Sequence, residues 1–199
     1  MPYTRLIARL AATADLTQED GQRLLALPST VRTFEHGAYV LRQGDMATQC
    51  AAVMRGVLTR EKVIADRNQI LSIHVPGDLP DLHTLLLPRM DHDLRSVGPS
   101  TIAFVPHSVL QTAVLASATL MHTLWRQTLV DAAIFREWVG NLGSRDALAR
   151  VAHLSCELTA RLEVVGLFIV EILDRNALEK LAEFDPDYLH HSRQKGFQP

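Results

Sequence analysis

The chain has 199 residues, of which 47% are hydrophobic and 21% are charged, and its formal net charge at pH 7 is −2. This apolar content excludes wholesale disorder, and the charge balance excludes a strongly basic nucleic-acid-binding protein at the level of the whole chain. No apolar run approaches the roughly 20 residues of a membrane span and the N-terminus lacks a signal-peptide pattern, so we expect a soluble, cytoplasmic protein.

The first half of the chain predicts two helices and then a series of short strands. Residues 5–12 have helical periodicity, and the capping signature Thr17-Gln18-Glu19-Asp20 predicts the start of a second helix, with Leu16 as a hydrophobic staple. Beyond it, short apolar runs are separated by glycine turns, and residues 71–75 alternate between apolar and polar side chains. Many short strands with glycine turns are typical of a small antiparallel barrel.

A long helix is predicted next, between Ala116 and Val139. Its apolar residues form two stripes, the first at Met121, Trp125, Thr128, Ala132, Phe135 and Val139, and the second at Val130, Ile134 and Trp138. One stripe can pack on the barrel and the other then needs a partner chain, which favours a homodimer over burial inside a monomer. The candidate dimer-interface residues are Leu120, Leu124, Thr128, Ala132, Phe135 and Trp138.

The C-terminal third predicts a second helix, a strand and a shorter helix. Gly143-Ser144 separates the long helix from an apolar repeat that ends near Val165, and Gly166 is a plausible stop. Residues 168–173 have the composition of a strand, and Asp174 can cap the short helix that follows. The last residues, from His190, have the composition of a polar tail, and we assign no specific role to His190-His191.

The order of barrel, long helix, second helix and β-wing resembles the Crp/Fnr family of bacterial transcription regulators. The segments that carry the resemblance are residues 39–45, 53–56, 69–78 and 150–154, and residues 174–188 are similar to the family's C-terminal end. The resemblance implies an α+β fold. It consists of an antiparallel jelly-roll β-barrel of the cyclic-nucleotide-binding type over residues 1–116, a dimerisation helix over residues 117–142, and a truncated winged-helix remnant over residues 143–199.

The resemblance implies an effector-sensing dimer that controls DNA binding through a hinge near residues 140–144. The family's helix-turn-helix has no counterpart between Leu167 and Phe168, so we assign no DNA-binding residues and expect DNA as a partner only if that segment is missing from the sequence. Two alternatives stay open. One is a module without a DNA reader that forms heterodimers with full-length relatives, and the other is a small-molecule-binding barrel with no role at DNA.

The resemblance also places an effector pocket, at Gly77, Asp78, Leu79, Pro80, Asp81, Leu82, His83, Arg95 and Ser96. In family members that bind cyclic nucleotides, a Gly-Glu pair holds the ribose and an Arg-Ser pair holds the phosphate. Here the cassette has no glutamate, and Asp93 and Leu94 lie nearer the register of the Arg-Ser pair. A carboxylate at that position repels phosphate, so cyclic AMP is disfavoured and the small-molecule effector is not identified.

Other chemistry is weakly supported by the sequence. His83, Asp91, His92 and Asp93 are residue types that bind divalent cations, but their spacing matches no known ligand pattern, so we predict no metal site and no cofactor. Cys50 and Cys156 are interpreted as small buried hydrophobic residues, and the N-terminal cysteine cluster of iron–sulfur members is absent. Because no Walker loop, GxGxxG motif or nucleophile motif is present, we expect a protein that is not an enzyme.

Overall fold

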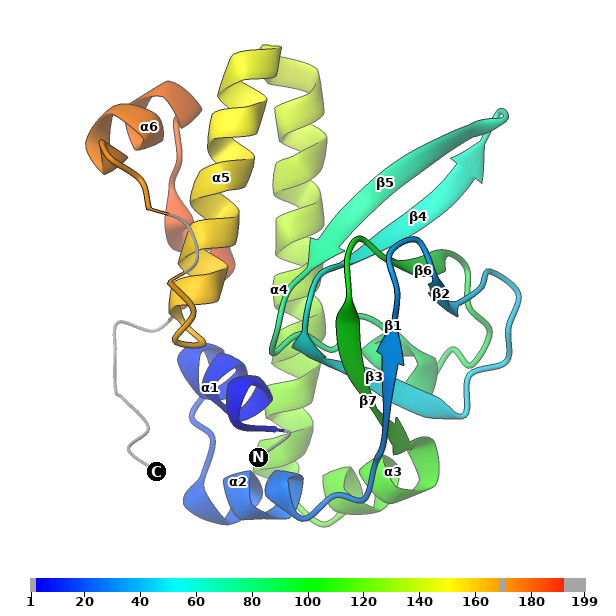
Figure 1. The fold of residues 1–199 in the computed structure, drawn as a ribbon. Helices are drawn as coiled ribbons and strands as arrows, with labels where there is room; N and C mark the ends of the chain where they lie inside the picture. The colour runs from blue at the N-terminus through cyan, green and yellow to red at the C-terminus, as the bar shows by residue number, and fades with distance from the viewer. Residues whose placement is uncertain (1–2, 169–170, 192–199) are drawn as a thin grey trace.

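The computed structural model describes residues 3–168 and 171–191 and contains two antiparallel sheets (Figure 1). The first sheet has the order β1-β7-β3, and the second has the order β2-β6-β4-β5. The strands are β1 (Thr30–Phe34), β2 (Tyr39–Leu41), β3 (Gln49–Arg55), β4 (Leu58–Ile64), β5 (Arg67–His74), β6 (Asp93–Ser96) and β7 (Ser100–Pro106). The predicted antiparallel strands are confirmed, but they do not close into a barrel, because no strand pairing joins the two sheets within the described chain.

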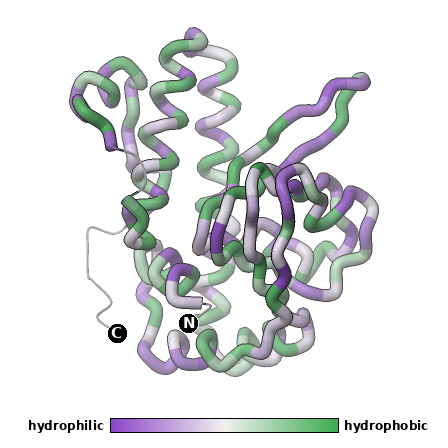
Figure 2. Tube along the Cα trace, viewed as in Figure 1, coloured by the Kyte–Doolittle hydropathy of each residue, from purple (hydrophilic) through white to green (hydrophobic). Residues whose placement is uncertain are grey.

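The helices lie on one side of the sheets and at their base (Figure 1). They are α1 (Thr4–Thr13), α2 (Gln18–Leu25), α3 (His107–Leu115), α4 (Ala118–Ser144), α5 (Ala147–Glu163) and α6 (Arg175–Ala182), with the 3-10 helices η1 (Leu82–Leu85) and η2 (Pro186–Leu189). Helices α4 and α5 stand side by side, and the β4–β5 hairpin extends away from them with a hydrophilic tip (Figure 2). None of the described helices is both long and apolar enough to cross a membrane.

Local sequence signals account for several helix ends. The Thr17 side chain accepts the Asp20 N–H at 3.1 Å, which confirms the predicted cap of α2. Gly166 has a φ of +71°, and the Leu167 N–H bonds to the Leu162 carbonyl at 3.0 Å, which confirms that α5 is stopped at this glycine. The predicted cap of the short C-terminal helix is also confirmed, since Asp174 accepts the Ala177 N–H at 2.9 Å.

The main hydrophobic core lies between the first sheet and the helices at its base. It joins α1, α2, α3 and the start of α4 to β3 and β7, and its fully buried members include Leu10, Leu24, Cys50, Ala103 and Leu120. Burial of each such leucine contributes about 1.5–3 kcal/mol. The second cysteine, Cys156, is buried between α5 and α6, so both cysteines are buried as predicted.

The strand predicted at residues 168–173 is wrong for the part of it that the structure describes. Phe168, Glu171, Ile172 and Leu173 are not in a strand, and residues 169–170 lie outside the described residues. Phe168 is 80% exposed and Leu173 is 93% exposed, so neither side chain packs on a sheet. A strand needs a hydrogen-bonded neighbour, and no described strand pairs with this segment. The segment instead leads into α6, which packs on α5.

Candidate effector site

A cavity of about 460 Å³ lies between the second sheet, the segment 77–92 and helix α4. Residues of α1, α5 and η2 also line it, so the predicted sensor domain and the helices that follow it share this space. The polar side chains that face it include Arg9, Arg60, His74, Asp78, His83, Asp91, His92, Asp131, Arg161 and His191. Pockets of this size bind small molecules, and a few convergent polar groups set their specificity.

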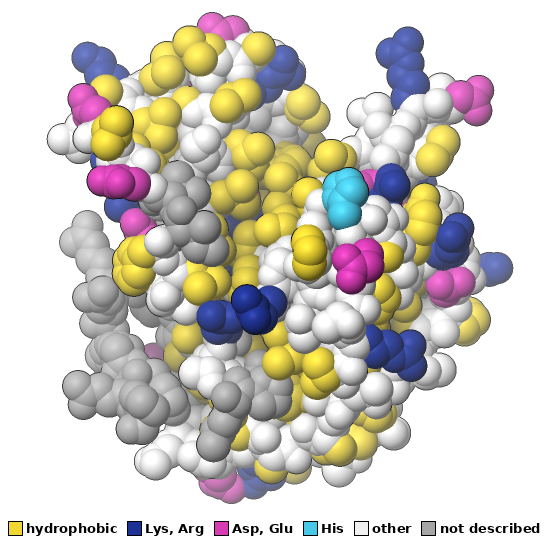
Figure 3. Space-filling model, viewed as in Figure 1, with side chains coloured by type: hydrophobic (Ala, Val, Ile, Leu, Met, Phe, Trp, Pro, Cys, Tyr) yellow, Lys and Arg dark blue, Asp and Glu magenta, His cyan; other side chains and the backbone are white. Residues whose placement is uncertain are grey.

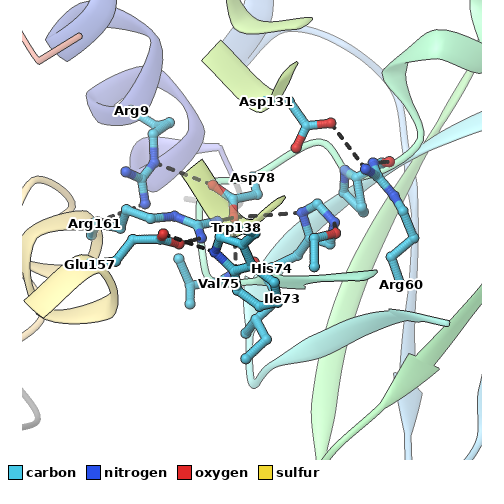
Figure 4. A network of polar contacts seen from close by, with 12 residues as sticks. Arg9, Arg60, Ile73, His74, Val75, Asp78, Asp131, Trp138, Glu157 and Arg161 are labelled. Atoms are coloured by element: carbon cyan, nitrogen blue, oxygen red, sulfur yellow. Dashed lines mark hydrogen bonds and ion pairs between the residues drawn. The ribbon is translucent and has the colours of Figure 1, made fainter. Parts of the chain in front are cut away.

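Asp78 is a buried carboxylate held by two arginines from distant parts of the chain (Figure 4). Nη2 of Arg161 on α5 lies 2.6 Å from Asp78 Oδ2, and Nε of Arg9 on α1 lies 3.3 Å from Asp78 Oδ1. Burial by itself would raise the pKa of Asp78, but the charges of Arg161 and Arg9 outweigh burial and hold its pKa below the usual value. Asp78 is therefore ionised at neutral pH and ties α1 and α5 to the turn after β5.

Glu157 on α5 is the second buried carboxylate of this network. Its Oε1 accepts a hydrogen bond from Arg161 Nη1 at 2.9 Å. Its Oε2 accepts from the Trp138 indole N–H at 3.0 Å and from the Tyr188 hydroxyl at 3.0 Å. Glu157 therefore connects the Asp78–Arg161 pair to Trp138 on α4 and to Tyr188 on η2.

Arg60 crosses the cavity from β4 to α4. Its Nη1 donates to Asp131 Oδ2 at 3.1 Å, and its Nη2 donates to the Pro80 carbonyl. The guanidinium carbon also lies 5.2 Å from the centre of the Phe135 ring. The Arg60–Asp131 pair therefore ties the second sheet to α4 across the cavity.

Four histidines line the cavity, and burial acts on all of them. Burial, followed by the charge of Arg60, lowers the pKa of His74 to about 3 and that of His92 to about 4. Burial and the charge of Arg9 lower the pKa of His191 to about 4, and burial lowers the pKa of His83 as well. His191, to which the sequence assigned no specific role, lies with its Nε2 3.5 Å from Arg9 Nη1. The low pKa values make these side chains neutral at pH 7.

Part of the predicted pocket lines the cavity. Asp78, Leu79, Pro80, Leu82 and His83 are all at its surface. Gly77 precedes them with a φ of +96°, and a Cβ there would lie 2.7 Å from the Arg5 carbonyl oxygen, so only glycine allows this close approach to α1.

The other predicted pocket residues lie elsewhere. Arg95 Nε donates to the Gly37 carbonyl at 2.9 Å, and Ser96 is buried with its Oγ 2.8 Å from Ser100 Oγ. Asp93 accepts the Gln43 N–H at 2.7 Å and does not line the cavity, so the sequence argument that Asp93 repels a phosphate there is wrong. Asp81 is fully buried behind the cavity lining, where its Oδ1 accepts the Ala51 N–H at 2.8 Å.

Asp81 gives a pH dependence of stability with a definite sign. Burial raises its pKa to about 7, although the Ala51 N–H lowers it, and its ordinary value is 3.8. Between pH 4 and 7 the folded chain therefore holds a proton on Asp81 that the unfolded chain has lost. The contribution of Asp81 to the free energy of unfolding consequently falls as the pH rises from 4 to 7. Relative to Asp81→Asn, the free energy of unfolding of the wild type should fall by about 2–4 kcal/mol from pH 4 to 7. Urea unfolding of both chains across this pH range measures the difference. If the free energies of unfolding of the two chains changed equally with pH, the raised pKa of Asp81 would be contradicted.

Sequence reasoning missed the charged residues that organise the cavity. Arg9, Arg60, Glu157 and Arg161 lie on helices and a strand without any motif around them. All four are buried, which is rare for arginine and glutamate unless they are paired. A signal existed at Arg161 only, because it stands four residues after Glu157, at the spacing of a helical ion pair.

The residues predicted for the dimer interface divide into two groups. Leu120 and Leu124 lie in the core of their own chain, and Trp138 packs on Val130 and Ile134, so these three belong to internal packing. Thr128, Ala132 and Phe135 line the cavity. The exposed apolar residues of this helix pair are instead Met121, Trp125, Leu129, Val139 and Leu142 on α4 and Leu148 and Val151 on α5. Figure 3 shows hydrophobic side chains gathered along the strip between α5 and the sheets, where α4 runs.

Comparisons with known proteins agree with this architecture. Residues 31–117 match the family model of the cyclic nucleotide-binding domain. A probable transcriptional activator from Rhizobium leguminosarum bv. viciae is 28% identical over 127 residues, which are 62% of this chain and 51% of that protein. The chain thus spans about half the length of the curated relative it matches.

Solved structures share the fold at low sequence identity. FixK2 from Bradyrhizobium japonicum has a TM-score of 0.64 at 19% identity, over 82% of this chain and 81% of that one. CLP, the c-di-GMP-responsive global regulator of Xanthomonas campestris, has a TM-score of 0.58 at 16% identity, over 84% and 90%. The Thermus thermophilus catabolite activator protein has a TM-score of 0.55 at 15% identity, over 84% and 83%. The chain therefore has the fold of Crp/Fnr-type transcription regulators, and its residues 31–117 match the cyclic nucleotide-binding domain.

Proposed function

We propose that this chain is the sensor of a Crp/Fnr-type transcription regulator, which binds a small effector in the cavity and controls DNA binding through a dimer. The observation that carries the proposal is the contact of Asp78 with Arg161 at 2.6 Å, because it joins the cavity lining to α5. An effector that displaces Asp78 changes the docking of α5, which is a population shift between two helix arrangements. No residue group in this site argues for catalysis, so the proposed role is regulatory.

The class of effector is a cyclic nucleotide or a molecule of similar size and polarity. The match of residues 31–117 to the cyclic nucleotide-binding domain supports this class, and CLP, one of the proteins with the same fold, responds to cyclic di-GMP. The cavity offers apolar walls from Leu71, Leu79 and Phe135 together with neutral histidines, which suit a base or another flat ring.

Tryptophan fluorescence tests the coupling between the cavity and α5. The chain has two tryptophans, so Trp125→Phe leaves Trp138, whose indole is bonded to Glu157, as the single reporter. We expect at least one of cyclic AMP, cyclic GMP and cyclic di-GMP to change the Trp138 emission saturably, and Asp78→Asn to abolish that change while calorimetry still detects binding. Absence of binding by all three would exclude the cyclic-nucleotide class, and an emission change that survives Asp78→Asn would exclude the coupling.

Asp131 sets the expected affinity for cyclic AMP. The cavity arginines are each paired with a carboxylate, so a phosphate must compete with Asp131 for Arg60. We expect weak binding of cyclic AMP to the wild type and about tenfold tighter binding to Asp131→Asn, which corresponds to about 1.4 kcal/mol. Asp93→Asn is the matched control, because Asp93 lies outside the cavity lining. Calorimetric titration would contradict this assignment if Asp93→Asn, and not Asp131→Asn, tightened binding.

A homodimer is part of the proposal. The exposed apolar stripe on α4 supports it, since Trp125 and Val139 each expose more than half of their surface and nothing in the described chain covers them. A second, apolar hollow of about 640 Å³ lies beside this stripe, between η1, α3 and the first half of α4. Such surfaces on one helix are typical of interfaces between identical chains.

One observation favours the alternative of an interaction module without a DNA reader. After α5, the described residues form only α6, of eight residues, which packs on α5, and η2, which packs on α4 and α5. This arrangement differs from a helix-turn-helix, which presents a second helix to the major groove. Co-expression with a full-length relative decides between the two roles, because the module forms heterodimers that bind DNA less than the relative alone does, whereas the sensor forms homodimers.

A further inference from the structure

Two histidines and one aspartate meet at the cavity although they come from separate parts of the chain. His83 lies on η1, whereas Asp91 and His92 lie in the bend before β6. One ligand atom from each, an imidazole nitrogen or a carboxylate oxygen, lies within 4.8 Å of the others. The two imidazole rings have their centres 5.3 Å apart. The fourth residue of the sequence cluster, Asp93, is not part of this group, since its carboxylate accepts the Gln43 N–H.

One imidazole nitrogen of each histidine, Nε2, lacks a hydrogen-bond partner in the described part of the chain. His92 is only 5% exposed, and His83 Nε2 and His92 Nε2 are both buried without a hydrogen-bond partner among the described residues. The Nδ1 of His92 lies 2.6 Å from Asp91 Oδ1, and because a carboxylate only accepts hydrogen bonds, Nδ1 is the donor. A cation that shares His92 with Asp91 replaces the Nδ1 proton and lies between His92 Nδ1 and Asp91 Oδ1. His83 Nε2, which is 3.9 Å from the same Oδ1, is then the third ligand atom.

We propose that His83, Asp91 and His92 form a binding site for a divalent transition-metal cation, with zinc as the best-suited ion, at the wall of the cavity. Two imidazoles and one carboxylate are a ligand set that zinc accepts, and water can complete the coordination. Ligand atoms in a four-coordinate zinc site are about 3.3 Å apart. His83 Nε2 is 3.9 Å from Asp91 Oδ1, and the Asp91 side chain is exposed, so a small rotation closes the site.

The charge around the site permits a cation. Burial and then the positive charge of Arg60 lower the pKa of both His83 and His92. The guanidinium of Arg60 is already paired with Asp131 at 3.1 Å. Asp91 supplies one negative charge to the ion itself. The inference goes beyond the proposed effector sensing, and the two are separable because each is tested with a different ligand.

Zinc titration of the untagged, full-length, metal-free chain tests the proposal. We expect one Zn²⁺ per chain by calorimetry, and binding at least tenfold weaker in Asp91→Asn and in His83→Gln. His122→Gln is the matched control, because His122 is exposed on α4 and is not one of the clustered residues. Asp91→Asn keeps the test valid if His83→Gln fails to fold, since the Asp91 side chain is exposed.

Thermal unfolding provides an independent readout. A cation that binds only the folded chain raises its melting temperature. Zn²⁺ should therefore raise the melting temperature of the wild type and of His122→Gln, and should leave that of Asp91→Asn unchanged. The proposal is overturned if the wild type shows no saturable binding of Zn²⁺, or if Asp91→Asn and His83→Gln both bind it as tightly as His122→Gln does.

Discussion

Replacing Arg161 with methionine is expected to lower the free energy of unfolding by about 3–5 kcal/mol. The guanidinium of Arg161 is the shared partner of Asp78 and Glu157, and all three side chains are buried. Methionine fills much of the same volume but leaves both carboxylates with less compensation for their lost hydration. Urea unfolding followed by circular dichroism at a fixed protein concentration measures the change.

Arg175→Met is the matched control for this substitution. Arg175 also contacts two carboxylates, those of Glu163 and Glu179, but its side chain is 46% exposed. Exposed pairs of this kind contribute about 0–1 kcal/mol, so the control should change the free energy of unfolding by less than that. If Arg161→Met and Arg175→Met lower the free energy of unfolding by the same amount, the buried network does not hold α5 in place.

Val139→Asp is expected to convert the proposed homodimer into a monomer. Val139 is 69% exposed in the C-terminal part of the apolar stripe on α4, and a carboxylate there would be buried and duplicated at a two-fold interface. The substitution leaves the fold of the chain intact, because the side chain makes no part of a core cluster. Light scattering should give twice the chain mass for the wild type and the chain mass for the variant.

Arg126→Gln is the control for charge. Like Val139→Asp, it lowers the net charge by one, and it also alters an exposed position of α4, but it lies on a different face of the helix. It should leave the dimer mass unchanged. A monomeric wild type, or a dimer that persists in Val139→Asp, would show that this stripe is not the interface. Phe135 is a poorer position for the test because its ring contacts Arg60 in the cavity.

Features set by neighbouring residues could be predicted from the sequence. The cap at Thr17, the stop at Gly166 and the cap at Asp174 depend on contacts within three to five positions. The family resemblance also placed Asp78 and His83 in one segment, and both line the cavity.

Features set by distant residues could not be predicted. Arg161 and Asp78 are 83 positions apart, and Arg9 is 152 positions from the Arg161 carbonyl that it contacts. No local sequence pattern can indicate either contact. Residues 168–173 have strand composition, but composition does not supply a partner strand. Arg95 and Ser96 on β6 do not line the cavity. Arg95 donates instead to the Gly37 carbonyl, 58 positions away, and no local pattern indicates that contact.

The most direct test of the account is hydrogen exchange along α5 in the wild type and in Asp78→Asn, without any ligand. Asp78, a carboxylate in the cavity lining, contacts α5 through Arg161. We therefore expect faster exchange of the amides in the last two turns of α5, residues 156–163, in Asp78→Asn, while the paired amides of β3 and β7 exchange at unchanged rates. Equal exchange along α5 in both chains would contradict it.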